Sequence, residues 1–413
     1  MIARRLSIIT LARITLARLS QKNLCRLAHP RQSEDATRMR LRIFTNVREP
    51  KAIDDRVECN AMTISGQNTT TRREFVLQSA LLTGGISLGL NSASSSLAAE
   101  TENPFLAYQQ RRRADLWSLL GDLPWQHQPA PPKLIRTEAH DGYTIERLEL
   151  DLNGIEPVPA LLLIPKKLKR PAPGALFMHW HAGMYGLGKE QLLQGTSVQP
   201  AYASVLAEMG VVTLAIDSWC FGERQHDTNG HRGEEDAFKL MLWRGQVLWG
   251  MMVFDEFRAL SYLASRPEVD PQRLGATGMS MGATKTWWLA ALDPRVQLAI
   301  DFCCLTDFDS LIAAHGLSGH SILYYVPSLL KEFDTAAINE LIVPRPRLSL
   351  NGRKDPLTPP AGVEKIREHL LPLYRQHGRQ EDCRIELFDC AHEETPEMRS
   401  LAIDWMRRYL APR

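Results

Sequence analysis

Short apolar runs alternate with helical stretches along the chain from about residue 134 to its C-terminal end. Strands alternating with helices are typical of a mostly parallel sheet whose two faces are covered by helices. The pattern therefore predicts an α/β fold with eight strands. We expect Trp243 and Trp249, on the longest predicted helix, to pack in the interior of this fold. The strands are expected at residues 145–152, 158–164, 175–179, 211–216, 273–277, 296–302, 347–350 and 384–388, and the helices at 201–209, 234–265, 283–292, 362–376 and 396–410.

Two stretches depart from this alternation. The first two strands are joined through Asn153-Gly154, a pair that favours a tight turn, so we expect a hairpin there. Residues 306–340 interrupt the alternation later in the chain, and they include Tyr324 and Tyr325. An insertion at this point would form a short cap over one edge of the sheet.

The residues before the α/β domain divide into three segments. Residues 1–61 have a net charge of +7, and we interpret them as an unstructured leader, or as translated from a start upstream of the true one. An organelle transit peptide is the alternative for this segment. Residues 62–99 form a second segment. Residues 100–133 are predicted to be a helical extension and a proline-rich linker, leaving 134–413 as the main domain.

Residues 62–99 resemble a bacterial twin-arginine export signal. Arg72-Arg73 precede a 16-residue apolar stretch, 75–90, and an exit rich in Ser and Ala. The apolar stretch is shorter than the ~20 residues that span a bilayer. An ordinary amphipathic helix is the alternative. We therefore expect the twin-arginine export machinery to recognise this segment, and the mature protein to work in the periplasm or outside the cell.

Charge and cysteine content argue against a nucleic-acid-binding protein and against a disulfide-stabilised scaffold. The chain beyond residue 99 has a net charge of −6 and no basic stripe, which argues against binding nucleic acid. It holds five cysteines, an odd number without a C-x-x-C pair, which argues against a disulfide framework. We expect these cysteines to be buried as small apolar side chains. They are Cys220, Cys303, Cys304, Cys383 and Cys390.

The sequence Gly-Met-Ser-Met-Gly at 278–282 lies between a predicted strand and a predicted helix. A glycine on each side of the serine allows a turn so tight that backbone segments nearly touch. Such a turn would hold the Ser280 hydroxyl above the edge of the sheet, beside a helix N-terminus. This arrangement is a nucleophile elbow, and it indicates acyl transfer.

A serine nucleophile needs a base within hydrogen-bond reach, and the base needs an acid that orients it. In folds with a nucleophile elbow, the acid and then the base follow the serine along the chain, each after a strand. Asp355 follows the strand 347–350, and His392 follows the strand 384–388. We therefore predict that Ser280, Asp355 and His392 form a catalytic triad.

Other acidic residues compete for the role of the acid. Asp301, Asp307 and Asp309 follow the strand after the elbow, a position that some hydrolases use. They are second choice because none lies in so clear a strand-to-helix turn. Asp389 is expected in a cap or a turn. For Asp355 itself the alternative role is an Asx turn before a proline.

The negative charge that develops on the substrate oxygen needs backbone N–H donors. We expect one donor at Met281 and the other at His181, in the loop 179–186 after the third strand. An H-x-H pair in this loop is a minority candidate for metal binding, because no third ligand is apparent. The candidate residues of the substrate pocket are His179, Trp180, Asp217, Tyr324 and Tyr325.

Together these motifs resemble the α/β-hydrolase superfamily over roughly residues 134–410. The elbow, Asp355, His392 and the His-x-His-x-Gly loop 179–183 carry the resemblance. Within the superfamily the chain is similar to the dienelactone-hydrolase-like and acetyl-xylan-esterase-like group, and to the catalytic domains of prolyl oligopeptidases. Two departures are clear. Dienelactone hydrolases use a cysteine where this chain has Ser280, and the mature chain lacks room for the propeller of prolyl oligopeptidases.

The resemblance implies a serine hydrolase that cleaves a carboxylic ester through an acyl-enzyme, with neither cofactor nor metal. Its partners would be small-molecule or glycan esters, and analogy extends these to acetylated polysaccharide. Two alternatives are open. One is a peptidase or amidase with the same triad, and the other is a non-catalytic binding protein that uses the fold as a scaffold.

Overall fold

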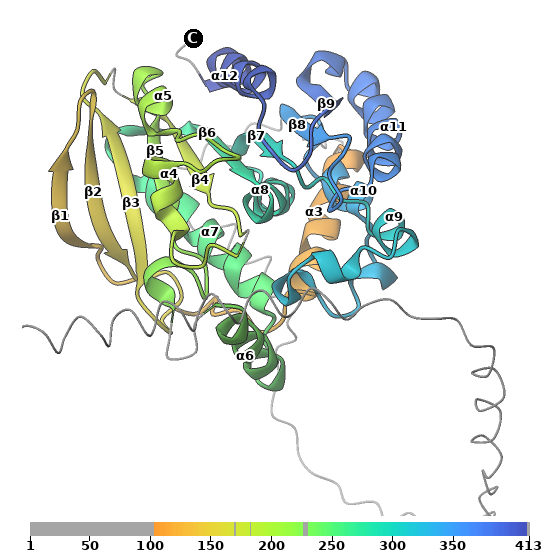
Figure 1. Cartoon of the computed structure of the whole chain (residues 1–413), viewed down its shortest axis with the longest axis horizontal. Coiled ribbons are helices and arrows are strands. Elements are labelled where there is room, and N and C mark those ends of the chain that lie inside the picture. The colour runs from red at the N-terminus through yellow and green to blue at the C-terminus, as the bar shows by residue number, and fades with distance from the viewer. Residues whose placement is uncertain (1–102, 169–170, 182, 226–229, 411–413) are drawn as a thin grey trace, which may run out of the picture. The chain divides into compact units, whose positions relative to one another are not determined.

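Nine strands form one sheet in the order β1-β2-β3-β5-β4-β6-β7-β8-β9 (Figure 1). This computed structural model describes residues 103–168, 171–181, 183–225 and 230–410. The strands are β1 (Lys133–Ala139), β2 (Tyr143–Leu150), β3 (Val158–Pro165), β4 (Ala172–Met178), β5 (Val212–Ile216), β6 (Val269–Met279), β7 (Val296–Phe302), β8 (Arg347–Gly352) and β9 (Cys383–Phe388).

All eight predicted strands are present, and β1 is the strand that the pattern missed. β1 lies at the sheet edge, and six of its seven residues are exposed, so it lacks the apolar run that marks the other strands. β1, β2, β3 and β5 pair antiparallel, whereas the pairs from β5 through β4 to β9 are parallel. The hairpin expected at Asn153-Gly154 joins β2 to β3, and Gly154 has a φ of 69°.

Helices cover both faces of the sheet. The α-helices are α3 (Pro104–Ser118), α4 (Gln191–Gln194), α5 (Ala203–Glu208), α6 (Gly230–Trp243), α7 (Leu248–Ser265), α8 (Met281–Leu292), α9 (Phe308–Ala313), α10 (Thr335–Glu340), α11 (Pro360–Gln376) and α12 (Pro396–Leu410). Two apolar cores result, one on each face. Leu176 and Met178 of β4 belong to the core beneath α7 and α8, and the alternate residues Ala175 and Phe177 belong to the core beneath α5 and α12.

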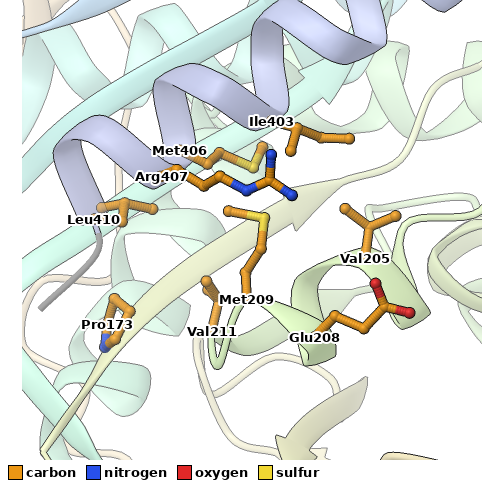
Figure 2. A pocket seen from close by; sticks show the side chains of 9 residues that line it. All are labelled: Pro173, Val205, Glu208, Met209, Val211, Ile403, Met406, Arg407 and Leu410. Carbon is orange, nitrogen blue, oxygen red and sulfur yellow. The ribbon is translucent and has the colours of Figure 1, made fainter.

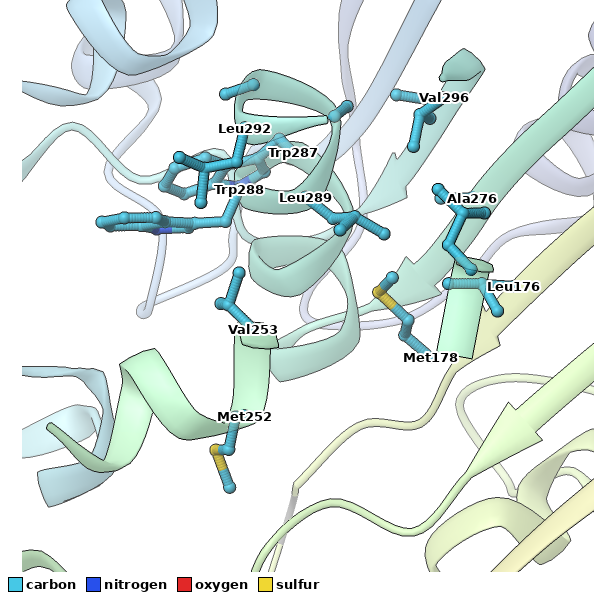
Figure 3. Packing of buried hydrophobic residues seen from close by; sticks show 14 of the residues in the cluster. Leu176, Met178, Met252, Val253, Ala276, Trp287, Trp288, Leu289, Leu292 and Val296 are labelled. Atoms are coloured by element: carbon cyan, nitrogen blue, oxygen red, sulfur yellow. The ribbon is translucent and has the colours of Figure 1, made fainter. Parts of the chain in front are cut away.

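Figure 3 shows the first of these cores from close by. The ring of Trp287 on α8 is fully buried, and that of Trp288 is 2 % exposed. Side chains of β4 and β6, among them Leu176 and Ala276, lie in the same cluster. This packing places α8, the helix that follows Ser280, against the middle of the sheet.

The prediction of one long helix at 234–265 is wrong, because two helices, α6 and α7, occupy this region. Gly245 lies between them with a φ of 77°, a left-handed conformation that ends an α-helix. The two tryptophans of this region therefore differ. Trp249 on α7 is buried as expected, whereas Trp243 at the end of α6 is 90 % exposed.

The insertion predicted between the sixth and seventh of the expected strands is present between β7 and β8. It contains α9, three 3-10 turns (Leu317–Gly319, Ile322–Tyr324 and Leu329–Lys331) and α10. The ring of His320 in this insertion stacks on Tyr324, with the ring centroids 4.6 Å apart, and its Nε2 lies 2.9 Å from the carbonyl oxygen of Leu357. The insertion is thereby held close to the loop after β8.

α3 is packed onto the main domain rather than extended away from it. The Arg113 guanidinium donates hydrogen bonds to the carbonyl oxygens of Ala291 (2.9 Å) and Leu341 (2.8 Å). The predicted leader and export signal, residues 1–99, lie outside the described residues and stay predictions. Among the helices that the structure describes, none combines the length and the apolar character needed to cross a bilayer. The five cysteines expected to be buried are buried and free.

Candidate active site

The strand–turn–helix expected around Ser280 is present. β6 ends at Met279 and α8 begins at Met281, so Ser280 alone makes the turn. Its backbone has a φ of 57° and a ψ of −117°, a conformation that residues other than glycine rarely adopt. Backbone strain of this kind is common at functional positions, where the surrounding structure enforces it.

Close backbone contact explains the two glycines of the elbow. A Cβ on Gly278 would lie 2.6 Å from the carbonyl oxygen of Met178, and a Cβ on Gly282 would lie 2.0 Å from the same oxygen. Any side chain at either position would push the elbow away from the end of β4. The absence of both side chains therefore lets the start of α8 rest against the loop that carries His181.

This contact brings together the two segments with the predicted oxyanion donors. Met281 is the first residue of α8, so its N–H has no carbonyl partner within the helix. The N-terminal end of a helix also favours negative charge. A Cβ on Gly282 would also lie only 3.0 Å from the carbonyl oxygen of His179, so the elbow and this loop are in close contact. The predicted donor at His181 lies two residues further along that loop.

The structure brings Asp355 and His392 into direct contact. Oδ2 of Asp355 lies 2.7 Å from Nδ1 of His392, the distance of a short hydrogen bond to a charged group. The side chain of Asp355 is fully buried, and that of His392 is 18 % exposed. Oδ1 of Asp355 accepts a hydrogen bond from the N–H of Leu357 at 2.9 Å. Asp355 thus forms the Asx turn considered as an alternative and also orients the imidazole.

Cys303 links this pair to the nucleophile elbow. The Ser280 N–H donates a hydrogen bond of 2.9 Å to the carbonyl oxygen of Phe302, the residue before Cys303. The ligand atoms of Cys303, Asp355 and His392 all lie within 4.8 Å of one another. β6, β7, β8 and β9 are parallel neighbours, so their carboxyl ends reach the same edge of the sheet. The three predicted triad residues therefore follow strands β6, β8 and β9, which end at the same edge of the sheet.

The competing acids are engaged elsewhere. Asp301 is fully buried, its Oδ2 lies 3.2 Å from the Arg347 guanidinium, and burial raises its pKa to about 6. Asp307 caps α9 and pairs with Lys365 at 3.1 Å. Two further acids are exposed and also paired with lysine, namely Asp309 with Lys365 and Asp389 with Lys354. Asp355 is the predicted acid that contacts His392.

Glu234 is a site residue that the sequence did not mark. It lies on α6, it is fully buried, and its Oε2 accepts hydrogen bonds from Nε2 of His181 (2.9 Å) and from the hydroxyl of Tyr185 (2.6 Å). Nδ1 of His181 accepts from the N–H of Gly183 at 3.0 Å. These bonds fix the tautomer of His181 and hold its loop in shape. No sequence motif connects Glu234 to a loop 53 residues earlier.

His179 is a structural residue and not part of the substrate pocket. It is fully buried, its Nδ1–H donates to the carbonyl oxygen of Trp180 (2.9 Å), and its Nε2 accepts from the N–H of Ser218 (3.1 Å). Burial and the nearby Lys285 hold the pKa of His179 well below its usual range, so the ring is neutral. With both nitrogens engaged, His179 cannot ligate a metal together with His181.

Asp217 and Trp180 are also enclosed by protein rather than facing a substrate. Oδ2 of Asp217 lies 2.7 Å from the Lys189 ammonium, and both side chains are at most 3 % exposed. Burial raises the pKa of Asp217, and Lys189 opposes this by stabilising the carboxylate. Trp180 is 6 % exposed and belongs to the second apolar core. The sequence placed both on the correct edge of the sheet but could not show which way they point.

Tyr324 and Tyr325 remain near the site, through the insertion. Tyr324 is 8 % exposed and stacks on His320, whose Nε2 contacts the loop two residues after Asp355. Tyr325 is half-buried, and its hydroxyl donates to the carbonyl oxygen of Leu317 at 2.6 Å. Both residues shape the insertion beside the triad, and Tyr325 retains an accessible surface.

A buried polar network supports the elbow helix from below. Lys285 on α8 is fully buried, and its ammonium donates to the Ser218 hydroxyl (2.6 Å) and to Glu256 (2.7 Å) on α7. Ser218 in turn donates its N–H to His179 in the oxyanion loop. This chain of bonds ties α8, α7 and the loops after β4 and β5 together. A lysine on the elbow helix reads as solvent-facing from sequence, which is why it was missed.

A cavity of about 360 Å³ lies between α5 and α12 (Figure 2). Pro173, at the start of β4, and Val211, just before β5, form part of its wall. The catalytic candidates follow the opposite, carboxyl ends of the strands. This cavity is therefore separate from the candidate active site.

The sheet order, the nucleophile elbow and the crossing helices define an α/β-hydrolase fold. The model of the abhydrolase family matches residues 90–356, and the chain belongs to this family. It is also similar to YtaP of Bacillus subtilis (strain 168), a protein provisionally named a hydrolase. The two are 41 % identical over 301 residues, which are 72 % of this chain and 99 % of YtaP.

Two solved structures share the fold. A Bacteroides fragilis NCTC 9343 protein, provisionally named an acetyl xylan esterase, superimposes with a TM-score of 0.58 at 19 % identity, over 69 % of this chain and 75 % of that one. A glucuronoyl esterase from Solibacter usitatus superimposes with a TM-score of 0.55 at 14 % identity, over 73 % and 93 %. At these identities the likeness concerns the fold alone.

Proposed function

We propose that this protein is a serine hydrolase that cleaves carboxylic esters. The observation that carries the proposal is the 2.7 Å contact between Asp355 and His392 beside the strained turn at Ser280. A buried carboxylate on Nδ1 keeps the proton of a neutral imidazole on that nitrogen, which leaves Nε2 free to accept a proton. That is the state a general base requires.

The mechanism follows from these positions. His392 accepts the hydroxyl proton as Ser280 attacks the ester carbonyl, and then delivers it to the leaving alcohol. Asp355 stabilises the imidazolium that forms in between. The N–H groups of Met281 and His181 donate to the oxyanion, with Glu234 holding the His181 loop in place. Water activated by His392 then releases the acid from the acyl-enzyme.

Esters carried on carbohydrate are the proposed substrates. The two similar structures are named as an acetyl xylan esterase and a glucuronoyl esterase. The chain beyond residue 99 has a net charge of −6, which argues against nucleic acid as the substrate. Deacetylation of polysaccharide is the most specific form of this proposal. It requires no cofactor or metal from the solvent.

Parallel assays on esters and amides test the reaction class. We expect purified protein to hydrolyse p-nitrophenyl acetate and acetylated xylan, and to leave prolyl p-nitroanilides intact. An ester offers a better leaving group than an amide. Release of p-nitroaniline at a rate equal to ester cleavage would favour the peptidase alternative. Absence of both activities, together with tight glycan binding, would favour the binding protein.

We also propose that the protein is exported through the twin-arginine route. Arg72-Arg73 and the apolar stretch after them support this, although they lie outside the described residues. Expression in a bacterium with this pathway should give a periplasmic or secreted product that begins near residue 100. Replacing both arginines by lysine should retain the full-length chain in the cytoplasm. N-terminal sequencing that shows exported protein starting at Met1 would refute the proposal.

A further inference from the structure

Cys303 lies against the acid–base pair and has no role in the mechanism above. It follows the last residue of β7, it is fully buried, and its backbone has a φ of 52°. Its Sγ lies 3.5 Å from the carbonyl oxygen of Glu393, the residue after His392. The thiol is thus held on the loop that carries the base.

We propose that Cys303, Asp355 and His392 form a binding site for a thiophilic divalent cation, with Zn²⁺ as the reference ion, and that its binding arrests catalysis. Only the second half of this proposal rests on the proposed esterase function. The first half concerns binding and is independent of what Ser280 does.

The three side chains offer the donor set that zinc prefers. Zn²⁺ is bound in proteins by cysteine sulfur at about 2.3 Å, histidine nitrogen at about 2.0 Å and carboxylate oxygen at about 2.0–2.2 Å. Donors around such an ion are separated by roughly 3–4 Å. Here the three ligand atoms lie within 4.8 Å of one another, and two of them, on Asp355 and His392, are already 2.7 Å apart. To bind an ion, the atoms on Asp355 and His392 must move slightly apart and the sulfur of Cys303 must move toward them.

The sulfur makes the site selective. Thiolate ligands favour Zn²⁺, Cd²⁺ and other soft or borderline ions, whereas Mg²⁺ and Ca²⁺ prefer oxygen ligands. An ion would enter past His392, whose side chain is 18 % exposed, since Asp355 and Cys303 are enclosed. On binding, the Cys303 thiol loses its proton to solvent and the sulfur–metal bond forms.

The binding geometry explains why catalysis would stop. The ion takes the place between Asp355 and Nδ1 of His392 that the shared proton holds in the active enzyme. A neutral imidazole with a metal on Nδ1 carries its remaining proton on Nε2. That nitrogen can no longer accept the proton of Ser280, so the nucleophile is not activated. Occupation therefore forces the inactive tautomer.

Calorimetric titration of the Ser280→Ala variant with ZnCl₂ measures binding without reference to activity. We expect one ion per chain. Adding Cys303→Ala should weaken the affinity by at least about tenfold, since loss of a direct ligand costs no less than loss of an outer partner. The matched control is Cys304→Ala, because Cys304 is the neighbouring buried cysteine and is outside the cluster. This control should bind as Ser280→Ala alone.

Inhibition is measured on proteins that retain Ser280. Zn²⁺ should inhibit the wild type and Cys304→Ala equally, Cys303→Ala should need at least about ten times more ion, and Mg²⁺ should have no effect. If Cys303→Ala does not fold, the Cys303→Ser variant takes its place in both experiments, because its hydroxyl can still donate to the carbonyl oxygen of Glu393. Equal zinc affinity with and without Cys303 would overturn the proposed site. Binding at Cys303 without inhibition would overturn the tautomer mechanism alone, and an inactive wild type that binds zinc would count against the esterase function and not against the site.

Discussion

Replacing Ser280 by alanine should lower kcat for ester hydrolysis by roughly 10⁴- to 10⁶-fold, while the protein stays folded. Removal of the nucleophile of a serine triad lowers the rate by about this much. The residual rate enhancement comes from the oxyanion donors and substrate binding. Alanine fits the space of the serine, and the strained turn is enforced by the contacts of Gly278 and Gly282 with β4. Initial rates on p-nitrophenyl acetate measure the loss of kcat, and a thermal melt shows whether the protein stays folded.

The matched control is Ser118→Ala, since Ser118 is an exposed serine at the end of α3. It should retain the full rate and the melting temperature of the wild type. A Ser280→Ala variant that keeps even a tenth of the rate would show that the hydrolysis has another nucleophile.

The exchange Asp355→Asn should lower kcat by about 10⁴-fold and change KM little. An amide has nearly the same shape as the carboxylate, but it favours the wrong imidazole tautomer and does not stabilise the imidazolium. The measurement is kcat and KM on the same ester at several pH values. Because Asp355 contacts His392 and not the substrate, the loss should fall on kcat.

Asp389→Asn is the control for this second prediction. Asp389 lies three residues before His392, but its side chain is 77 % exposed and pairs with Lys354. Its replacement should leave both constants within about a factor of two, because exposed ion pairs contribute little. A large loss at Asp389 with a small loss at Asp355 would exchange their assigned roles.

Most of the sheet and the contact between Asp355 and His392 could be predicted because both follow from local patterns. A strand buried on both faces, such as β4, appears as a continuous apolar run. The elbow has two glycines at fixed places, and the acid and base each follow a strand. The order of parallel strands then brings these loops to one edge, so chain order alone indicated that Asp355 and His392 meet.

Other features depend on contacts that no local pattern records. The polarity of Glu234 and Lys285 predicts exposure, yet each is fully buried and hydrogen-bonded to a partner more than 25 residues away. His179 lies on the predicted loop but turns into the protein. β1 was missed because its residues are exposed on an edge strand, and the break between α6 and α7 lies at Gly245, whose left-handed conformation the helical pattern does not record.

Labelling with a fluorophosphonate probe tests the central claim most directly. The probe forms a covalent bond only with a serine activated by a base, so it reports the assembled triad without a choice of substrate. We predict one adduct per chain on the wild type, located at Ser280 by mass spectrometry of peptides. The adduct should be absent from Ser280→Ala and strongly slowed in His392→Ala. An unlabelled wild type, or an adduct on any other residue, would contradict the account.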